Sequence, residues 1–190
     1  MLKKNTLRIT GGSYLSRRLC FIPENELRPT TDRIRETVFS WLQSEIREYK
    51  ILDLFAGSGV LGFEALSRNA SQVVFVERNK NSITQLKNNL KNLKISEKQA
   101  QVFHTDSFDY LKRSQDSFDL IFLDPPFSGN LICDFFNQIN NFSCLNHLKW
   151  IYLEQTVKKN WPVLPEPWYW YRQKVAGQVK FSLLCKRTDV

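Results

Sequence analysis

The chain has 190 residues, of which 42% are hydrophobic and 24% are charged. These values are typical of one soluble globular domain, and they exclude wholesale disorder. No apolar run approaches the roughly 20 residues that a membrane-spanning helix requires, so we expect no membrane association. Lysine and arginine outnumber aspartate and glutamate by 27 to 19, which gives a net charge of +8.

The first residues carry positive charge, but no apolar segment follows them. We therefore expect no secretory signal peptide and a cytoplasmic location. Four cysteines are scattered without a C-x-x-C pair, and the chain has only two histidines. This pattern predicts neither a disulfide framework nor a metal site.

The excess of positive charge lies at the two ends of the chain. Residues 1–50 contain 10 basic and 6 acidic side chains, residues 51–130 contain 9 of each, and residues 131–190 contain 8 and 4. Basic flanks around a neutral centre suit a polyanionic partner, because neutralisation of phosphates supplies affinity that does not depend on sequence. A well-solvated basic surface without a partner is the alternative interpretation.

The first part of the chain is predicted to be a small β segment followed by a helix. Two short strands, residues 7–10 and 18–22, flank a turn at Gly11-Gly12. Thr30 or Thr31 can cap a helix over about residues 32–48, whose apolar side chains recur every four residues.

From residue 51 onward, predicted strands alternate with predicted helices. The strands are expected at residues 51–55, 72–77, 101–104, 118–123 and 150–154. The helices are expected at residues 60–69, over the apolar stripe 83–93, and at residues 129–140. A terminal hairpin is expected at about 168–187. The aromatic cluster within residues 161–171 is interpreted as packing of this hairpin, and stacking of nucleic-acid bases is the alternative. The Lys- and Asn-rich residues 78–94 are interpreted as a solvated helix face.

This alternation predicts an α/β fold with a parallel sheet that helices cover on both faces. In such sheets, ligands bind beyond the carboxyl ends of the strands. Four acidic residues fall at or just past predicted strand ends: Asp53, Glu77, Asp106 and Asp124.

Residues 57–62 read Gly-Ser-Gly-Val-Leu-Gly, a G-x-G-x-x-G pattern between a predicted strand and a predicted helix. Gly57 permits a tight turn, Gly59 a close approach of ligand to backbone, and Gly62 close packing of helix on strand. Glu77 lies twenty positions after Gly57, where a carboxylate accepts both hydrogen bonds of a ribose diol. The pattern indicates a nucleoside-containing cofactor rather than a simple connecting turn.

The position of Asp53 bears on the identity of this cofactor. A dinucleotide places its pyrophosphate at the helix N-terminus, where a nearby carboxylate would repel it. S-adenosylmethionine instead carries an ammonium group, an adenosine end and no phosphate. The chemistry therefore favours the methyl donor, and 190 residues leave little room for the substrate domain of a dehydrogenase.

A predicted strand runs directly into Asp124-Pro125-Pro126-Phe127. Two prolines fix the backbone and remove two N–H donors, so the loop presents carbonyl oxygens and the Asp124 carboxylate. Such acceptors can hold the two hydrogens of a nucleobase amino group and aim its nitrogen lone pair at a methyl sulfonium. Phe127 offers a flat surface for a flipped base.

Residues 53–59 together with the Asp-Pro-Pro-Phe loop resemble the amino-directed class of S-adenosylmethionine-dependent methyltransferases. Residues 8–12, 27–39 and 176–179 resemble the bacterial RsmD family, and the resemblance covers nearly the whole chain. It implies a Rossmann-like methyltransferase fold with a seven-stranded mixed sheet and a small N-terminal β extension. It also implies methyl transfer from S-adenosyl-L-methionine to the N2 amino group of a guanine in 16S rRNA.

The resemblance further implies the roles of individual residues. Residues 1–30 would form a basic extension that contacts RNA, and residues 31–190 the methyltransferase domain. The substrate would be 16S rRNA within a small ribosomal subunit or an assembly intermediate, and the protein would act as a monomer. The catalytic loop comprises Asp124, Pro125, Pro126 and Phe127. The cofactor-binding residues comprise Asp53, Phe55, Ala56, Gly57, Ser58, Gly59, Glu77, Asp106 and Ser107. The candidate RNA contacts comprise Arg8, Arg17, Arg18, Arg28 and Arg33.

Three other functions use some of the same features. A DNA adenine-N6 methyltransferase would share the loop chemistry, but such enzymes usually carry a larger target-recognition region. A nucleotide-dependent oxidoreductase would share the glycine loop but would leave Asp-Pro-Pro-Phe unexplained. A non-enzymatic RNA-binding assembly factor would bind rRNA without needing Asp124.

Overall fold

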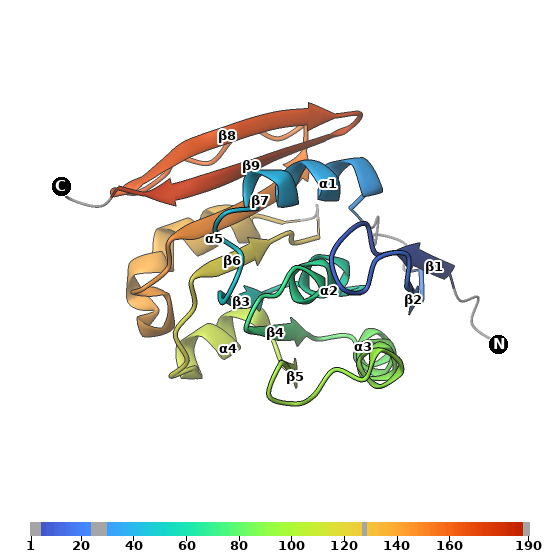
Figure 1. Ribbon diagram of the computed structural model, residues 1–190. Coiled ribbons are helices and arrows are strands. Elements are labelled where there is room, and N and C mark those ends of the chain that lie inside the picture. The colour runs from blue at the N-terminus through green and yellow to red at the C-terminus, as the bar shows by residue number, and fades with distance from the viewer. Residues whose placement is uncertain (1–4, 24–29, 127–128, 188–190) are drawn as a thin grey trace.

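The computed structural model describes residues 5–23, 30–126 and 129–187. Its centre is a seven-stranded sheet in the order β5-β4-β3-β6-β7-β9-β8, in which β9 runs antiparallel to both of its neighbours (Figure 1). The strands of this sheet are β3 (Lys50–Asp53), β4 (Gln72–Glu77), β5 (Ala100–His104), β6 (Leu120–Leu123), β7 (Trp150–Thr156), β8 (Trp168–Ala176) and β9 (Val179–Lys186). The predicted seven-stranded mixed sheet is confirmed.

Helices cover both faces of the sheet, because alternate residues of each strand point to opposite sides. Ile51 of β3 faces one apolar core and Leu52 the other. The first core packs under α1 (Asp32–Trp41), α2 (Val60–Ser67) and α3 (Lys80–Leu93). The second packs under α4 (Ser107–Arg113), α5 (Leu131–Gln138) and the 3-10 turns Ile139–Asn141 and Ser143–Leu145.

The first helix ends earlier than its apolar pattern predicts. We expected it to run to about residue 48, but α1 ends at Trp41 and turns follow. Leu42 and Ile46 are both buried, so their spacing reflects a compact turn packed on the core rather than a further helical stretch. Glu48 adopts a left-handed backbone conformation that redirects the chain into β3. The prediction of residues 42–48 as helix is therefore wrong.

The N-terminal segment forms an antiparallel hairpin of β1 (Asn5–Arg8) and β2 (Arg18–Phe21). Ile9 and Leu19 are fully buried in the first core, so this hairpin packs on the rest of the chain. Asn89 of α3 is also buried: its side chain accepts from the backbone N–H of Cys20 at 3.0 Å and donates to the Cys20 carbonyl at 2.8 Å. At Asn89, therefore, the expected solvated helix face is wrong.

A buried guanidinium joins the hairpin to the helices. Arg35 of α1 has no exposed surface, and it donates to the Glu64 carboxylate of α2 at 3.0 Å. It also donates to the backbone carbonyls of Arg8 and Thr30. Glu64 in turn accepts from the backbone N–H of Thr10 at 2.7 Å and pairs with Arg68. Because every partner is hydrogen-bonded, this buried charge is compensated on several sides.

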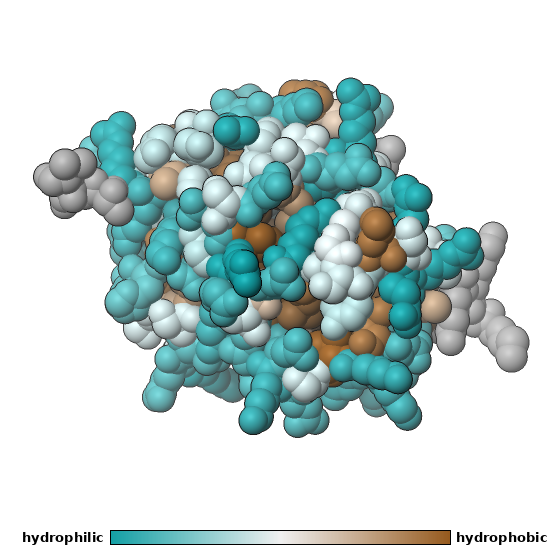
Figure 2. Space-filling model, in the orientation of Figure 1, coloured by the Kyte–Doolittle hydropathy of each residue, from teal (hydrophilic) through white to brown (hydrophobic). Residues whose placement is uncertain are grey.

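One face of the molecule is mainly hydrophilic. Figure 2 shows hydrophobic residues on this face only in small areas between polar residues. No helix in the described part of the chain is long and apolar enough to cross a membrane.

We predict that Arg35→Met destabilises the protein by about 3–5 kcal/mol, because the change removes one of the two cationic partners of the buried Glu64 carboxylate and the arginine donor to the Arg8 and Thr30 carbonyls. Urea unfolding would measure the loss in free energy of unfolding. The matched control is Arg33→Met, an exposed arginine of the same helix, which should change that free energy by less than about 0.5 kcal/mol. Equal effects of the two changes would contradict this account of Arg35.

Candidate active site at the carboxyl ends of the strands

The sheet brings acidic residues from four strands to one edge. Asp53 ends β3, Glu77 ends β4, and Asp124 directly follows β6. The parallel register of β6 and β7 pairs Leu123 with Leu153, so the next residues, Asp124 and Glu154, lie side by side. None of the ion pairs among the described residues involves any of these four carboxylates.

The glycine loop is held against β4 by Glu77. The backbone N–H of Gly57 donates to one oxygen of this carboxylate at 2.8 Å, and that of Asn79 donates to the other at 2.7 Å. Gly57 has a positive φ of 50°, as expected for a tight turn. The acid predicted to bind a ribose therefore also fixes the shape of the loop.

The two later glycines of the loop are required by packing. A Cβ at Gly62 would lie 2.3 Å from the Phe75 ring of β4, which confirms the predicted close approach of helix to strand. Gly59 has a φ of 74°, and a Cβ there would lie 2.3 Å from Leu86. The left-handed backbone and the contact with α3 thus already favour glycine at this position, whereas the sequence suggested a ligand as the reason.

Asp53 is a buried carboxylate, and one neutral donor reaches it from the described part of the chain. It is 3% exposed, and it accepts from the backbone N–H of Gly62 at 3.2 Å. Burial, reinforced by the negative charge of Glu77, raises the pKa of Asp53 to about 7. A cationic ligand beside this group would favour its charged form and lower that pKa.

The remaining residues predicted for the cofactor also support the loops around it. Asp106 caps α4 by accepting from the backbone N–H groups of Phe108 and Asp109, and the Ser107 hydroxyl donates to the Leu54 carbonyl at 3.1 Å. Within the glycine loop, the Ala56 N–H donates to the Val76 carbonyl, the Ser58 hydroxyl accepts from Val60, and Phe55 packs on the second core. These contacts place the predicted residues around one edge of the sheet.

A second hydrogen-bonded group lies next to Asp124. The Thr30 hydroxyl oxygen is 3.4 Å from an Asp124 carboxylate oxygen and 3.2 Å from a Glu154 oxygen. The Tyr152 hydroxyl donates to the same Glu154 oxygen at 2.6 Å. One threonine proton thus serves two carboxylates, and Thr30, Tyr152 and Glu154 are all buried.

The electrostatics of this group follow from crowding. Burial raises the pKa of Asp124 well above its usual range, and the charges of Glu154 and Asp53 raise it further. Burial also raises the pKa of Glu154. Two carboxylates that share one hydroxyl donor resist simultaneous ionisation, so the pair tends to retain a proton.

Sequence reasoning missed Thr30, Tyr152 and Glu154 as site residues. The rule that selected the other acids also applies to Glu154, which lies on the strand predicted at residues 150–154. Thr30 was interpreted only as a helix cap, but Thr31 is the N-cap residue of α1 and makes no capping hydrogen bond with its side chain. No local pattern marks Thr30, because its partners lie 94 and 124 positions away.

Four of the predicted RNA contacts are exposed residues of the N-terminal hairpin segment and of α1. Arg8 and Arg18 are exposed, directly paired residues of the N-terminal hairpin, and Arg8 forms a 3.3 Å ion pair with Asp32. Arg17 and Arg33 are exposed as well. The predictions for Arg28 and for Phe127 of the Asp-Pro-Pro-Phe loop fall outside the described residues.

Comparison with known proteins places the chain among methyltransferases. The profile of the family described as Conserved hypothetical protein 95 matches residues 7–185. Ribosomal RNA small subunit methyltransferase D of Haemophilus influenzae is 42% identical over 182 residues, which cover 95% of this chain and 94% of that protein. The Escherichia coli K12 protein of the same name is 38% identical over 177 residues, covering 93% and 88%. The solved structure of Escherichia coli yhhF, described as a methyltransferase, matches with a TM-score of 0.85 at 35% identity, covering 97% of this chain and all of that chain.

A mixed seven-stranded sheet, with a glycine loop and an Asp-Pro-Pro loop at its carboxyl edge, defines a Rossmann-like, S-adenosylmethionine-dependent methyltransferase. Within this class, the chain belongs to the Ribosomal RNA small subunit methyltransferase D family, because identity is high and both chains are covered almost completely. The family resemblance predicted from the sequence is confirmed.

We predict that Asp53→Asn stabilises the ligand-free protein by about 1–3 kcal/mol at pH 8. A folded pKa above the unfolded value means that the charged carboxylate destabilises the fold at high pH. This penalty is present above about pH 7 and disappears as the pH falls toward the unfolded pKa of aspartate. The variant and wild type should therefore unfold with similar free energies near pH 4.5 and differ at pH 8. An equal difference at both values would contradict the raised pKa.

Proposed function

We propose that this chain transfers a methyl group from S-adenosyl-L-methionine to the exocyclic N2 amino group of a guanine in small-subunit 16S rRNA. The observation that carries the proposal is the position of Asp124-Pro125-Pro126 at the end of β6, beside the glycine loop that follows β3. The rRNA substrate is supported by the names of the relatives. The guanine N2 position is supported by the RsmD resemblance of the sequence.

The residues around the glycine loop fit S-adenosylmethionine. The buried Asp53 and Glu154 and the partly exposed Asp124 have no ion-pair partner among the described residues, which suits a ligand with two positive charges and no phosphate. Asp53 would hold the ammonium end, Glu77 the ribose, and Asp106 with Ser107 the adenine end. When bound, S-adenosylmethionine supplies an electrophilic methyl group on a positively charged sulfur.

Asp124 and the carbonyl oxygens of the Pro-Pro loop would orient the target amino group. An amino nitrogen that received the methyl group from the bound cofactor would have to lose one proton. Asp124 would accept this proton, either during methyl transfer or after it. The Thr30 hydroxyl lies between Asp124 and Glu154. The proton could therefore pass from Asp124 to Glu154 through this one hydroxyl.

The remaining contacts concern the RNA. Phe127 would stack on the target base, and Arg8, Arg17, Arg18, Arg28 and Arg33 would contact phosphates of the surrounding RNA. The exposed arginines of the hairpin and of α1 support this part of the proposal. The substrate would be a small ribosomal subunit or an assembly intermediate, methylated in the cytoplasm by a monomer.

The first test is transfer of labelled methyl from S-adenosylmethionine to small ribosomal subunits and to naked rRNA, both from cells lacking this gene. We expect label in N2-methylguanosine after nucleoside analysis. Asp124→Ala should reduce the rate at least about 100-fold, because it removes an acceptor that acts in the transition state. RNA affinity should change little.

The outcomes separate the alternatives. Label in adenine N6 of DNA would replace the proposed substrate while keeping the loop chemistry. RNA binding without any transfer, and with Asp124→Ala as effective as wild type in cells, would replace the enzyme with an assembly factor.

We predict that Glu154→Gln shifts the acid limb of the pH–rate profile to lower pH. The negative charge of Glu154 raises the pKa of Asp124, so its removal should let Asp124 ionise at lower pH. The other ionisable groups in this cluster, Asp53 and Tyr152, remain unchanged. Rates are measured at saturating cofactor and RNA, so that titration of Asp53 does not enter through cofactor affinity.

The matched control is Tyr152→Phe, which removes a hydrogen bond to Glu154 but keeps both carboxylates. It should leave Asp124 and Glu154 coupled and should not reproduce the shift to lower pH. An acid limb that is the same in Glu154→Gln and wild type would show that Glu154 does not act on Asp124.

A further inference from the structure

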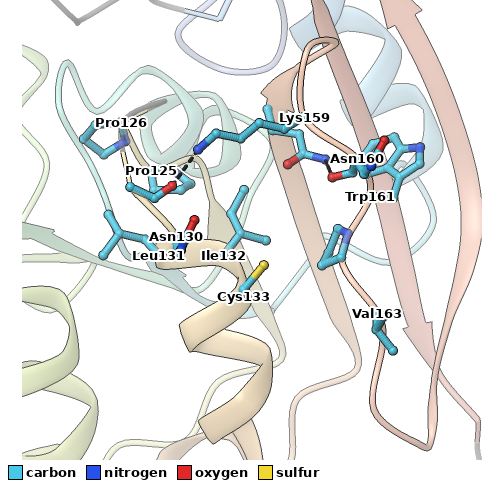
Figure 3. Close-up of a pocket in the computed structure, with 13 residues that line it drawn as sticks. Pro125, Pro126, Asn130, Leu131, Ile132, Cys133, Lys159, Asn160, Trp161 and Val163 are labelled. Atoms are coloured by element: carbon cyan, nitrogen blue, oxygen red, sulfur yellow. Dashed lines mark hydrogen bonds between the residues drawn. The ribbon is translucent and has the colours of Figure 1, made fainter.

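A cavity of about 400 Å³ lies beside the Asp-Pro-Pro loop, and no residue of the glycine loop lines it (Figure 3). Its walls are Pro125 and Pro126, the first turn of α5, and the segment 159–163 that follows β7. Asp53, Glu77 and Asp124 are not among its lining residues. The cavity therefore adjoins the catalytic loop without being part of the acidic cofactor site. Its volume lies within the range of about 300–1,000 Å³ that is typical of ligand pockets.

The walls of this cavity combine apolar surface with positive charge. Ile132 and Trp161 contribute apolar side chains, and none of the described lining residues is acidic. Lys159 is the charged lining residue, and Lys180 lies 4.4 Å from the centre of the Trp161 ring. This chemistry suits a flat apolar group that carries a negative charge. The acidic residues Asp53, Asp124 and Glu154 instead favour a positively charged group.

Lys159 connects the two walls. Its ammonium donates to the backbone carbonyl of Gly129 at 2.6 Å, and Figure 3 shows its side chain spanning the cavity from the segment after β7 toward the Pro-Pro loop. The partner is a neutral carbonyl rather than a carboxylate. The ammonium can therefore turn to a phosphate without breaking an ion pair.

We propose that this cavity binds the nucleotide next to the methylated guanine in the RNA strand. Its base would pack against Trp161 and Pro125, and its phosphate would bind Lys159. The inference rests on the proposed function, since a target base at Asp124 places its neighbour in the strand at the adjoining surface. Aromatic stacking and a phosphate contact at this point would hold the strand while the target base is turned toward Asp124.

Two single variants test the proposal without touching the catalytic loop. Trp161→Ala and Lys159→Met should each raise the KM for RNA about fivefold or more, with kcat and cofactor affinity unchanged within about twofold. Lys158→Met is the matched control, because Lys158 is an exposed neighbour outside the cavity lining. Trp161→Phe keeps a flat ring and should retain most of the RNA affinity, which separates stacking from loss of fold.

RNA carrying one abasic nucleotide on either side of the target guanine identifies the occupant. Wild type should lose about fivefold or more in RNA affinity for one of the two abasic substrates. Trp161→Ala should bind this abasic substrate as tightly as it binds the intact RNA, because the variant already lacks the stacking contact. If both abasic substrates weakened RNA binding by the same factor in wild type and in Trp161→Ala, the proposal would be overturned.

Binding is measured separately from methyl transfer by fluorescence anisotropy of the labelled RNA fragment. Weaker binding by Lys159→Met and Trp161→Ala, together with no methyl transfer by wild type, would keep an RNA site at the cavity and remove the proposed enzyme function. Unchanged RNA affinity and unchanged KM in both variants would overturn the cavity proposal even if guanine N2 is methylated.

Discussion

The arrangement of this molecule depends on the buried guanidinium of Arg35. Burying a charge is unfavourable unless its hydrogen bonds are complete, and here they reach Glu64, Asp32 and two backbone carbonyls. One of these carbonyls belongs to Thr30, whose hydroxyl lies between Asp124 and Glu154. Arg35 thus both attaches the N-terminal hairpin to the helices and holds Thr30, a residue of the candidate active site, in place.

The acidic residues at the carboxyl ends of the strands, unlike Arg35, are not fully compensated by partners. Three carboxylates are buried or enclosed with few donors, and burial raises the pKa values of Asp53, Asp124 and Glu154. In a protein selected for stability alone, such groups would be neutral side chains or would have cationic partners. Under the proposed function, these carboxylates persist because they bind a positively charged cofactor. The free energy that they cost in the ligand-free protein would then give selectivity for a positively charged ligand over one that carries phosphate.

Patterns within single segments predicted the sheet and most acids of the site. Asp53, Glu77 and Asp124 could be found because each follows an apolar run whose end is visible in the sequence. The contacts of Thr30 and Glu154 with Asp124 could not be predicted. They depend on the pairing of β6 with β7 and on the hydrogen bond from Arg35 to Thr30. Gly59 shows a related limit, since its packing against Leu86 depends on the position of another helix.

The side chain of Asn89 has a consequence for the hairpin that it contacts. A two-stranded hairpin is marginally stable alone, and its free edge can template pairing with another chain. The amide of Asn89 satisfies both the N–H and the carbonyl of Cys20, as a third strand would do at that position. Through this one side chain, helix α3 therefore occupies the backbone groups of Cys20 that could pair with a strand of another chain. The basic hairpin can thus remain exposed with less tendency to aggregate.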